Sequence, residues 1–370
     1  MTTYFFEQIT QDQALSYTSL DALAFLSADL RAAEIAATFT LGTPTVAETV
    51  TLAARGRAVT LSVAFEGELD VLLPNGSILY VGTAAANTDP RPGGAGDDAF
   101  FGNDGADRFT LGAGNNFAQG NQGADTLIGG TGADTLFGGK DNDSISTGDG
   151  VNFAHGNLGS DTVIGGLGAD YLYGGQANDV LTGGGGADYL NGNLGSDTVT
   201  GGVDGDLIFG EADNDSLVGL GGSDTLYGGA GADTIAGGVG AVGVPNGARD
   251  LLYGGEGADR FAFAATDSLV VAGNGDQILD WATEDRLAFT AGPAGTALNY
   301  SEATASTFGD AVVLANAAIA AGTINYMSIQ VGTDVVVFAD VPATGNGVAE
   351  VAIVLVGRTL AHIDFGSIVI

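Results

Sequence analysis

The sequence predicts an all-β protein with a parallel β-roll of about nine coils at its centre, a β-rich region before the roll and a β-rich capping domain after it. Three observations support this fold class. A nine-residue pattern recurs in eighteen units from residue 93 to residue 262, and only one unit is lengthened, by eight residues. Each unit couples a glycine-rich turn to a short strand pattern. The flanking segments contain β-branched runs separated by Gly, Pro and Asn-Gly, which is typical of strands and hairpins.

The repeat is most regular at its sixth and eighth positions. GGTGADTLF (129–137), GGLGADYLY (165–173) and GGAGADTIA (228–236) are typical units. The eighth position is Leu, Ile, Val or Phe, except at Ala118 and Ala154. The sixth position is aspartate in sixteen units and asparagine in the two units that carry alanine. In chain order the sixth-position residues are Asp98, Asp107, Asn116, Asp125, Asp134, Asp143, Asn152, Asp161, Asp170, Asp179, Asp188, Asp197, Asp206, Asp215, Asp224, Asp233, Asp250 and Asp259.

The turns have the chemistry of a site for a hard cation. Glycine lets a turn bend tightly and brings backbone carbonyls together, and a carboxylate beside them completes an oxygen-only site suited to Ca²⁺. The triplet after each turn forms a short strand whose middle side chain points inward, so the eighth-position residues fill a thin core. We expect the sixth-position residues to line Ca²⁺ sites, with weak or absent binding at Asn116 and Asn152 because an amide carries no charge.

The GGxGxDxUx pattern of these units resembles the RTX family of calcium-binding repeats. The resemblance implies a Ca²⁺-loaded roll. If neighbouring turns on the same side share one ion, the roll holds on the order of ten to sixteen Ca²⁺. The formal net charge is −35, from 45 acidic and 10 basic residues. Without Ca²⁺ the aspartate rows repel one another, so we expect the roll to be unfolded in a low-calcium cytosol and folded outside the cell.

The C-terminal part resembles the ends of secreted RTX proteins. Residues 258–289 are similar to the segment that closes the roll in serralysin-type peptidases, through DRF (259–261), DQILDW (276–281) and DRL (285–287). The final residues, AHIDFGSIVI, resemble the uncleaved signal of type I secretion substrates. These features divide the chain into a β-rich region (1–90), the roll (93–262) and a capping domain with the secretion signal (263–370). They imply export by the type I secretion machinery of a Gram-negative bacterium.

Composition and missing motifs argue against several classes of protein. The acidic surface repels nucleic acid and anionic membranes, and no apolar run approaches the roughly 18 residues of a membrane helix. The start, MTTYFFEQITQDQ, shows no cleavable signal peptide, and zero cysteines exclude disulfides. His155 and His362 cannot form an HExxH zinc helix, and GxSxG and GxxxxGK[ST] motifs are absent. We therefore expect no enzyme activity, with His155 on the surface. Residues 19–37 are compatible with one helix.

The two outer faces of the roll are predicted to differ. In odd-numbered units the ninth position is mostly aromatic, and where it turns polar the seventh position is aromatic instead. The candidate interface residues on this face are Phe101, Phe117, Phe137, Phe153, Tyr171, Tyr173, Tyr189, Phe209, Tyr227 and Tyr253. Even-numbered units carry a hydroxyl ladder at the seventh position, made of Thr126, Ser144, Thr162, Thr198, Ser216 and Thr234. An aromatic face of this size predicts a cover, which is a flank of the same chain, another copy of the protein, or a sugar.

These inferences favour a secreted, calcium-binding structural protein that assembles outside the cell as a surface layer, matrix filament or adhesive. The layout resembles RTX S-layer proteins, which join rolls to short β-rich regions. The expected partners are other copies of the chain and the type I secretion machinery, with cell-surface glycan as a further candidate. Two alternatives stay open. One is a secreted hydrolase with its site in residues 1–90, and the other is an ice- or glycan-binding adhesin that uses the hydroxyl or aromatic ladder.

Overall fold

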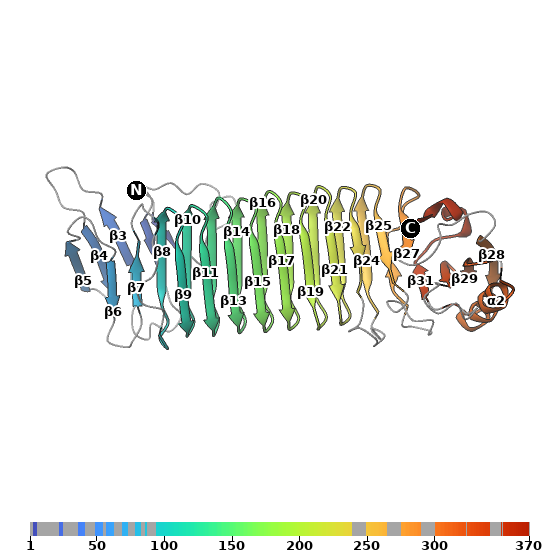
Figure 1. Ribbon diagram of the computed structural model, residues 1–370, viewed down its shortest axis with the longest axis horizontal. Coiled ribbons are helices and arrows are strands. Elements are labelled where there is room, and N and C mark those ends of the chain that lie inside the picture. Colours follow the sequence, from blue (N-terminus) through green and yellow to red (C-terminus); the bar gives the residue numbers. More distant parts are fainter. Residues whose placement is uncertain are drawn as a thin grey trace.

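The computed structural model is a rod in which a long parallel roll lies between two terminal regions (Figure 1). It describes residues 94–238, 249–264, 275–289, 300–322, 324–340, 349 and 351–369, together with seven short strands, Gly82 and Ala86 in the N-terminal region. The predicted fold class, an all-β protein centred on a parallel β-roll, is confirmed.

Successive units of the repeat supply strands to two facing sheets in turn. We call the first the aromatic sheet, and its strands in the repeat are β8 (Ala99–Asp104), β10 (Phe117–Gln122), β12 (Thr135–Lys140), β14 (Phe153–Leu158), β16 (Tyr171–Gln176), β18 (Tyr189–Leu194), β20 (Leu207–Ala212), β22 (Thr225–Ala230) and β24 (Leu251–Glu256). We call the second the hydroxyl sheet, and its strands are β9 (Arg108–Ala113), β11 (Thr126–Thr131), β13 (Ser144–Asp149), β15 (Thr162–Leu167), β17 (Val180–Gly185), β19 (Thr198–Gly202), β21 (Ser216–Leu220), β23 (Thr234–Ala236) and β25 (Arg260–Phe263).

Each strand pairs in parallel with the strand one coil away, so equivalent positions stack. In the hydroxyl sheet Leu127 is in register with Ile145, and in the aromatic sheet Leu136 is in register with Ala154. The register repeats every eighteen residues, because two nine-residue units make one coil. The turns therefore form two edges. We call the turns that lead into the aromatic sheet the aromatic edge, and those that lead into the hydroxyl sheet the hydroxyl edge.

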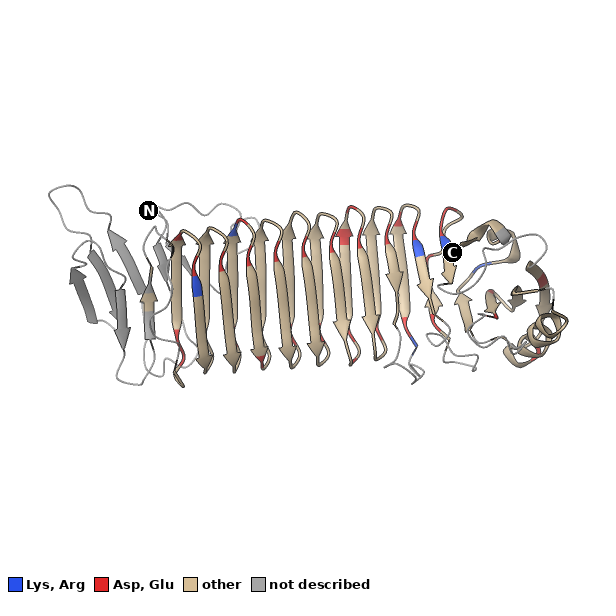
Figure 2. Cartoon of the chain, viewed as in Figure 1, with Lys and Arg blue, Asp and Glu red and all other residues tan. Residues whose placement is uncertain are grey.

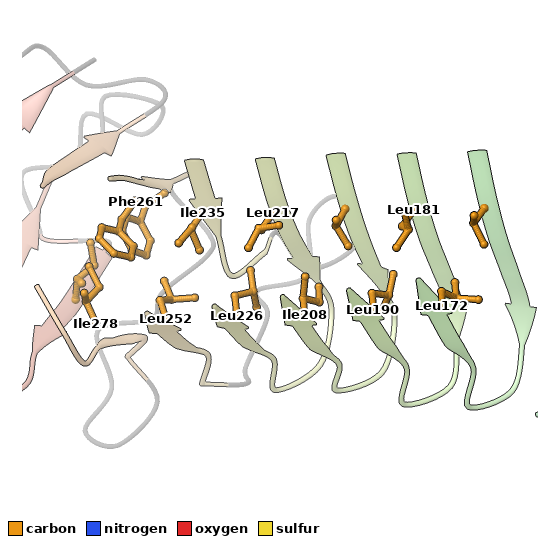
Figure 3. Packing of buried hydrophobic residues seen from close by; sticks show 14 of the residues in the cluster. Leu172, Leu181, Leu190, Ile208, Leu217, Leu226, Ile235, Leu252, Phe261 and Ile278 are labelled. Atoms are coloured by element: carbon orange, nitrogen blue, oxygen red, sulfur yellow. The ribbon is translucent and has the colours of Figure 1, made fainter. Parts of the chain in front are cut away.

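The core is a thin double row of eighth-position side chains. Figure 3 shows one row from each sheet, with Leu172, Leu190 and Ile208 facing Leu181 and Leu217. These residues are fully buried, while the seventh and ninth positions on either side face outward, as the alternation of a strand requires. With one such side chain per strand, the core alone buries little apolar surface for each ordered residue, and this makes the turns important for stability.

Strands also occupy the N-terminal region. A five-stranded sheet contains β1 (Thr3–Phe5), β2 (Ala22–Ala24), β3 (Ala36–Thr40), β4 (Thr49–Ala54) and β5 (Arg57–Ser62). The next strands, β6 (Leu69–Leu72) and β7 (Ile78–Val81), extend the aromatic sheet, because β7 pairs in parallel with β8. A single helix over 19–37 was a wrong interpretation, since β2 and the start of β3 lie in that interval. The loose apolar spacing there defines no helical stripe, and β2 pairs with β1 instead.

The roll continues past residue 262 into the C-terminal region. The hydroxyl sheet adds β27 (Arg286–Phe289) and β32 (Ile368–Val369). The aromatic sheet adds β26 (Gln277–Ile278), then β31 (Val351–Leu355), β30 (Asp334–Ala339), β29 (Tyr326–Val331) and β28 (Tyr300–Ala305). Short 3₁₀ turns, η2 (Leu360–His362) and η3 (Phe365–Ser367), precede β32. Trp281 is buried, and its indole N–H donates to the His362 carbonyl oxygen at 3.0 Å.

One helix in this region was not anticipated from the sequence. Helix α2 (Phe308–Ala320) begins after Thr307, whose hydroxyl accepts a hydrogen bond from the Asp310 backbone N–H. This N-cap was the available signal. Its Ala311, Ala315 and Ile319 pack into a small second core with strands β28–β30. Among the described residues, no helix is long and apolar enough to cross a membrane.

Candidate metal sites in the turns

The sixth-position side chains form two continuous hydrogen-bonded ladders. After the first residue of each row, every Oδ1 atom accepts a hydrogen bond from the backbone N–H of the sixth-position residue one coil earlier, as between Asp161 and Asp179 at 2.7 Å. The distances along both ladders are 2.7–3.1 Å. Figure 2 shows acidic residues along both turn edges and very few basic ones. The structure therefore brings all eighteen predicted residues into two rows.

On the aromatic edge the row consists of Asp98, Asn116, Asp134, Asn152, Asp170, Asp188, Asp206, Asp224 and Asp250. On the hydroxyl edge it consists of Asp107, Asp125, Asp143, Asp161, Asp179, Asp197, Asp215, Asp233 and Asp259. Their exposed fractions are only 0–3 %. Each row is thus a file of buried polar groups at the rim of a thin core.

The second carboxylate oxygen is the unusual atom of these turns. In the described structure a buried Oδ2 has no hydrogen-bond partner at Asp125, Asp134, Asp143, Asp161, Asp170, Asp179, Asp188, Asp197, Asp206, Asp215, Asp224, Asp233 and Asp259. A buried, unpaired carboxylate oxygen is strongly unfavourable unless a proton or a cation satisfies it. The repetition of the same orphaned atom in turn after turn indicates a ligand with positive charge.

Burial also shifts the acidity of these groups. The pKa of Asp143 is raised from 3.8 to about 9, mainly by burial and to a smaller extent by the neighbouring Asp161 and Asp125 carboxylates. Burial likewise raises the pKa of Asp179 and Asp224 to about 8 and that of Asp125 to about 7. The backbone N–H that each carboxylate accepts opposes the shift without cancelling it. A bound cation removes this penalty, because it stabilises the ionised form.

The asparagine turns show what faces the second side-chain atom. The Asn152 Nδ2 donates to the carbonyl oxygens of Gly148 and Gly150, at 3.2 and 3.3 Å. These are the second and fourth positions of the same turn. An aspartate has an oxygen in place of this amide nitrogen, so an aspartate turn lacks both of these hydrogen bonds. Among the described residues no group of three or more His, Cys, Asp or Glu side chains is arranged to hold a metal ion. Any ion in these turns would therefore need backbone carbonyl ligands besides the carboxylate.

Comparison with known proteins agrees with this geometry. The family described as RTX calcium-binding nonapeptide repeat matches the chain at residues 93–118, 119–154, 146–181, 155–190, 173–208, 182–217, 209–241 and 246–265. The roll of this chain consists of RTX calcium-binding nonapeptide repeats. RTX repeats indicate Ca²⁺ binding, and the stacked aspartates fit that role. No curated protein matches the chain.

Two solved structures are similar to this RTX chain. One is the extracellular lipase LipA of Serratia marcescens, at 16% identity and a TM-score of 0.27, covering 65% of this chain and 40% of the lipase. The chain therefore spans less than half of the lipase. The other is the AlgE6R3 subunit of the Azotobacter vinelandii mannuronan C5-epimerase, at 22% identity and a TM-score of 0.25, covering 55% of this chain and 78% of that subunit.

The RTX ladders extend beyond the predicted residues. Asp276 and Asp285 continue the two rows, accepting hydrogen bonds from the backbone N–H groups of Asp250 and Asp259 at 3.0 and 3.1 Å. The sequence interpretation used both residues only as part of a capping pattern. The available signal was their spacing of 26 residues, the same as between Asp224 and Asp250. The Asp285 Oδ2 accepts the Ala282 N–H at 2.6 Å, so this oxygen already has a partner and Asp285 ends its row.

The candidate interface residues form one column of rings on the outer face of the aromatic sheet. Consecutive ring centroids are 4.4–5.9 Å apart along Phe101, Phe117, Phe137, Phe153, Tyr173, Tyr189, Phe209, Tyr227 and Tyr253. Tyr171 lies beside this column, 6.1 Å from Tyr189, and is 49% exposed. Where the ninth position is polar, the aromatic residue at the seventh position takes its place in the column. The column therefore stays unbroken. Most of the rings are half-buried by one another.

No described flank residue overlies the middle of this column, since the described flanks lie beyond the two ends of the roll (Figure 1). The idea that a flank of the same chain covers it finds no support in the described residues. His155, which was expected on the surface, lies on the outer face of the aromatic sheet but is in contact with the column. It is half-buried, with its ring stacked 5.6 Å from that of Tyr173, and burial lowers its pKa to about 4.

The predicted hydroxyl ladder is also in register on the outer face of the other sheet. Thr126 pairs with Ser144, and Ser144 pairs with Thr162. Val180 interrupts the series, which resumes from Thr198 through Ser216 to Thr234. The two faces of the roll therefore differ in chemistry along their whole length.

Proposed function

We propose that this RTX chain is a secreted structural protein that folds outside the cell when it binds Ca²⁺ and then assembles with other copies of itself. The observation that carries the calcium part is the repeated buried Oδ2 atom without a hydrogen-bond partner. Each ion brings two positive charges to oxygens that otherwise repel one another. The ligands at each site are the sixth-position aspartate and the carbonyls of the second and fourth positions, which suit a hard cation.

Calcium acts as a folding switch in this proposal. On the order of ten to sixteen Ca²⁺ would offset most of the formal net charge of −35. Extracellular Ca²⁺ modules commonly have dissociation constants of about 10⁻⁴ to 10⁻³ M. Such affinities leave the sites empty in a low-calcium cytosol and fill them outside the cell. The chain therefore stays unfolded for export by the type I machinery, whose signal we place in residues 361–370.

The aromatic column supports assembly. It is a continuous, partly exposed strip of aromatic rings along a rod with acidic turn edges, and the described flanks leave it uncovered over the middle strands. Contiguous apolar strips of this kind mark interaction surfaces. A second copy presents the same strip, and bound Ca²⁺ lowers the repulsion between two acidic rods. We propose that the assembled form is a surface layer, matrix filament or adhesive, and that the chain has no catalytic activity.

Electron microscopy and light scattering of the purified chain test the proposal. At millimolar Ca²⁺ we expect ordered assemblies, and with chelator we expect dispersed, unfolded chains by circular dichroism. A protein that folds with Ca²⁺ but stays monomeric at all concentrations would refute assembly. Retention of glycans on the folded monomer, lost when the aromatic column alone is substituted, would favour the adhesin alternative. Hydrolysis lost on substituting a carboxylate in residues 1–90 would favour the hydrolase.

A further inference from the structure

Two turns on the aromatic edge differ from all the others at several positions together. They are residues 111–116 and 147–152. In both, the sixth position is asparagine, the seventh is phenylalanine and the eighth is alanine. The first position departs as well, because it is Leu111 in one turn and Thr147 in the other. The first position of each of the sixteen aspartate units is glycine. Loss of the first glycine and loss of the sixth aspartate therefore always occur together.

A direct contact between the first and sixth positions explains this coincidence. Gly129 and Gly165 stand at the first position one coil before and one coil after Thr147. A β-carbon at Gly129 would lie 2.5 Å from the Asp134 Oδ2 and even closer to the Thr147 carbonyl oxygen of the next coil. One at Gly165 would lie 2.5 Å from the Asp170 Oδ2 and even closer to the Gly183 carbonyl oxygen. These separations are far inside van der Waals contact. A side chain at the first position is therefore incompatible with an aspartate that keeps this side-chain position, and it also requires the backbone of the next coil to shift.

The asparagine turns use that space differently. The Asn152 Oδ1 keeps its place in the ladder and accepts the Asp134 N–H at 2.9 Å, while its Nδ2 donates to the two turn carbonyls. The Thr147 hydroxyl donates to the Gly165 carbonyl oxygen at 2.9 Å. In the other turn the Asn116 Nδ2 donates to the Gly114 carbonyl oxygen at 3.2 Å. The amide N–H groups thus point at the carbonyls that the aspartate turns offer to a cation.

The core residues of these two turns also differ from those of the aspartate turns. Leu111 and Thr147 are fully buried, and so are Ala118 and Ala154, which replace the larger eighth-position residues of other units. A large side chain at the first position and a small one at the eighth keep the total volume of the thin core similar. These turns are therefore complete structures of a second kind, with their polar atoms paired inside the chain.

We propose that turns 111–116 and 147–152 bind no Ca²⁺ and are closed by their own amide hydrogen bonds, as two metal-free links placed two coils apart in the aromatic edge. This inference rests on the proposed calcium-dependent folding of the roll. It predicts that the aromatic edge holds two fewer ions than its number of turns allows. It also predicts that these two turns stay ordered at Ca²⁺ concentrations at which the aspartate turns open.

Restoring the missing site tests the proposal through metal stoichiometry. Bound Ca²⁺ is counted by equilibrium dialysis and elemental analysis of the full chain. Asn152→Asp alone should add no ion, because the Thr147 β-carbon blocks the carboxylate oxygen. Thr147→Gly combined with Asn152→Asp should add one. Asp170→Asn, in the adjacent aspartate turn, is the matched control and should remove one. A full extra ion in Asn152→Asp alone, or no gain in a folded double variant, would overturn the proposal.

Anomalous diffraction from the wild-type protein crystallised with Ca²⁺ keeps the test independent of whether the variants fold. We expect anomalous peaks beside aspartate turns of both edges and none in turns 111–116 and 147–152. A peak in either asparagine turn overturns this inference and leaves the proposed function intact. Absence of peaks from all turns overturns the proposed calcium-dependent folding and the inference with it.

Discussion

Asp179 offers a way to separate the metal contribution of one turn from its hydrogen bond. The Asp179 Oδ1 accepts the Asp161 N–H at 2.7 Å, while Oδ2 is the buried atom without a partner in the described structure. In Asp179→Asn the amide oxygen keeps the ladder bond, as the Asn152 Oδ1 does, and only the charged ligand is lost. In Asp179→Ala both the ligand and the hydrogen-bond acceptor are lost. The two variants therefore differ in the ladder hydrogen bond and in the bonds that an asparagine Nδ2 donates to turn carbonyls, as in the Asn152 turn.

The expected magnitudes differ in their dependence on calcium. A site that is filled at 100 times its dissociation constant stabilises the fold by about 2.7 kcal/mol, and the contribution changes by about 1.4 kcal/mol for each tenfold change in Ca²⁺. Asp179→Asn should therefore lower the free energy of unfolding by about 1.4 kcal/mol at ten times the dissociation constant and by about 2.7 kcal/mol at a hundred times. Asp179→Ala should cost a further ~1–3 kcal/mol, because the Asp161 N–H is left buried without a partner.

Urea unfolding followed by far-ultraviolet circular dichroism, at about 1, 10 and 100 mM Ca²⁺, measures both quantities for the wild type and the two variants. The wild-type-to-asparagine difference should grow with Ca²⁺, and the asparagine-to-alanine difference should stay constant. An Asp179→Asn cost that does not change with Ca²⁺ would refute the reasoning, because the carboxylate would then act only through the ladder. Repeating the series in Mg²⁺ is a control for ionic strength.

Three further predictions follow from the same geometry. In chelator, folding should be promoted by acid, because burial raises the pKa of carboxylates such as Asp143 and Asp179 to about 9 and 8. The stability that their protonated forms contribute is complete below the unfolded pKa near 4 and is lost as the pH rises through 8 to 9. Equal circular dichroism spectra at pH 4 and 9 would contradict this prediction. Leu190→Ala should lower the free energy of unfolding, measured in urea at saturating Ca²⁺, by about 2–5 kcal/mol, because the side chain is fully buried in the double row. A loss below about 1 kcal/mol would show that neighbouring side chains move into the cavity and would contradict this prediction. Replacing both Tyr173 and Tyr189 by serine should reduce assembly, measured by light scattering, without changing the number of bound Ca²⁺ ions. Replacing Thr162 and Thr198 by alanine on the opposite face should leave assembly unchanged. An equal loss of assembly in both double variants would argue against the aromatic column as the interface.

The sequence alone determined the repeat, the fold class and the set of sixth-position residues. This was possible because each nine-residue unit encodes its own turn and strand. Each coil of the roll contacts only the coils next to it, so the local repeat is enough to define the whole stack. The split into an aromatic and a hydroxyl face followed from the same periodicity. Sequence reasoning failed where the period ends. Helix α2 has only a capping signal, and Asp276 and Asp285 follow insertions that disguise their place in the ladders.

Only the tertiary structure decided which atoms meet across coils. The eighteen-residue register assigns Oδ1 to the backbone ladder and leaves Oδ2 of aspartates such as Asp179 buried without a hydrogen-bond partner in the described structure. The residue type alone does not reveal this difference between the two oxygens. The register also shows that rings from seventh and ninth positions touch in one column. Finally, it places the first-position β-carbon of a turn where the carboxylate oxygen lies. Such contacts depend on packing within a few tenths of an ångström, which residue type and spacing do not specify. For this reason the sequence predicted only weak or absent Ca²⁺ binding at the two asparagine units, and the fold added the contacts from which we propose that they bind none.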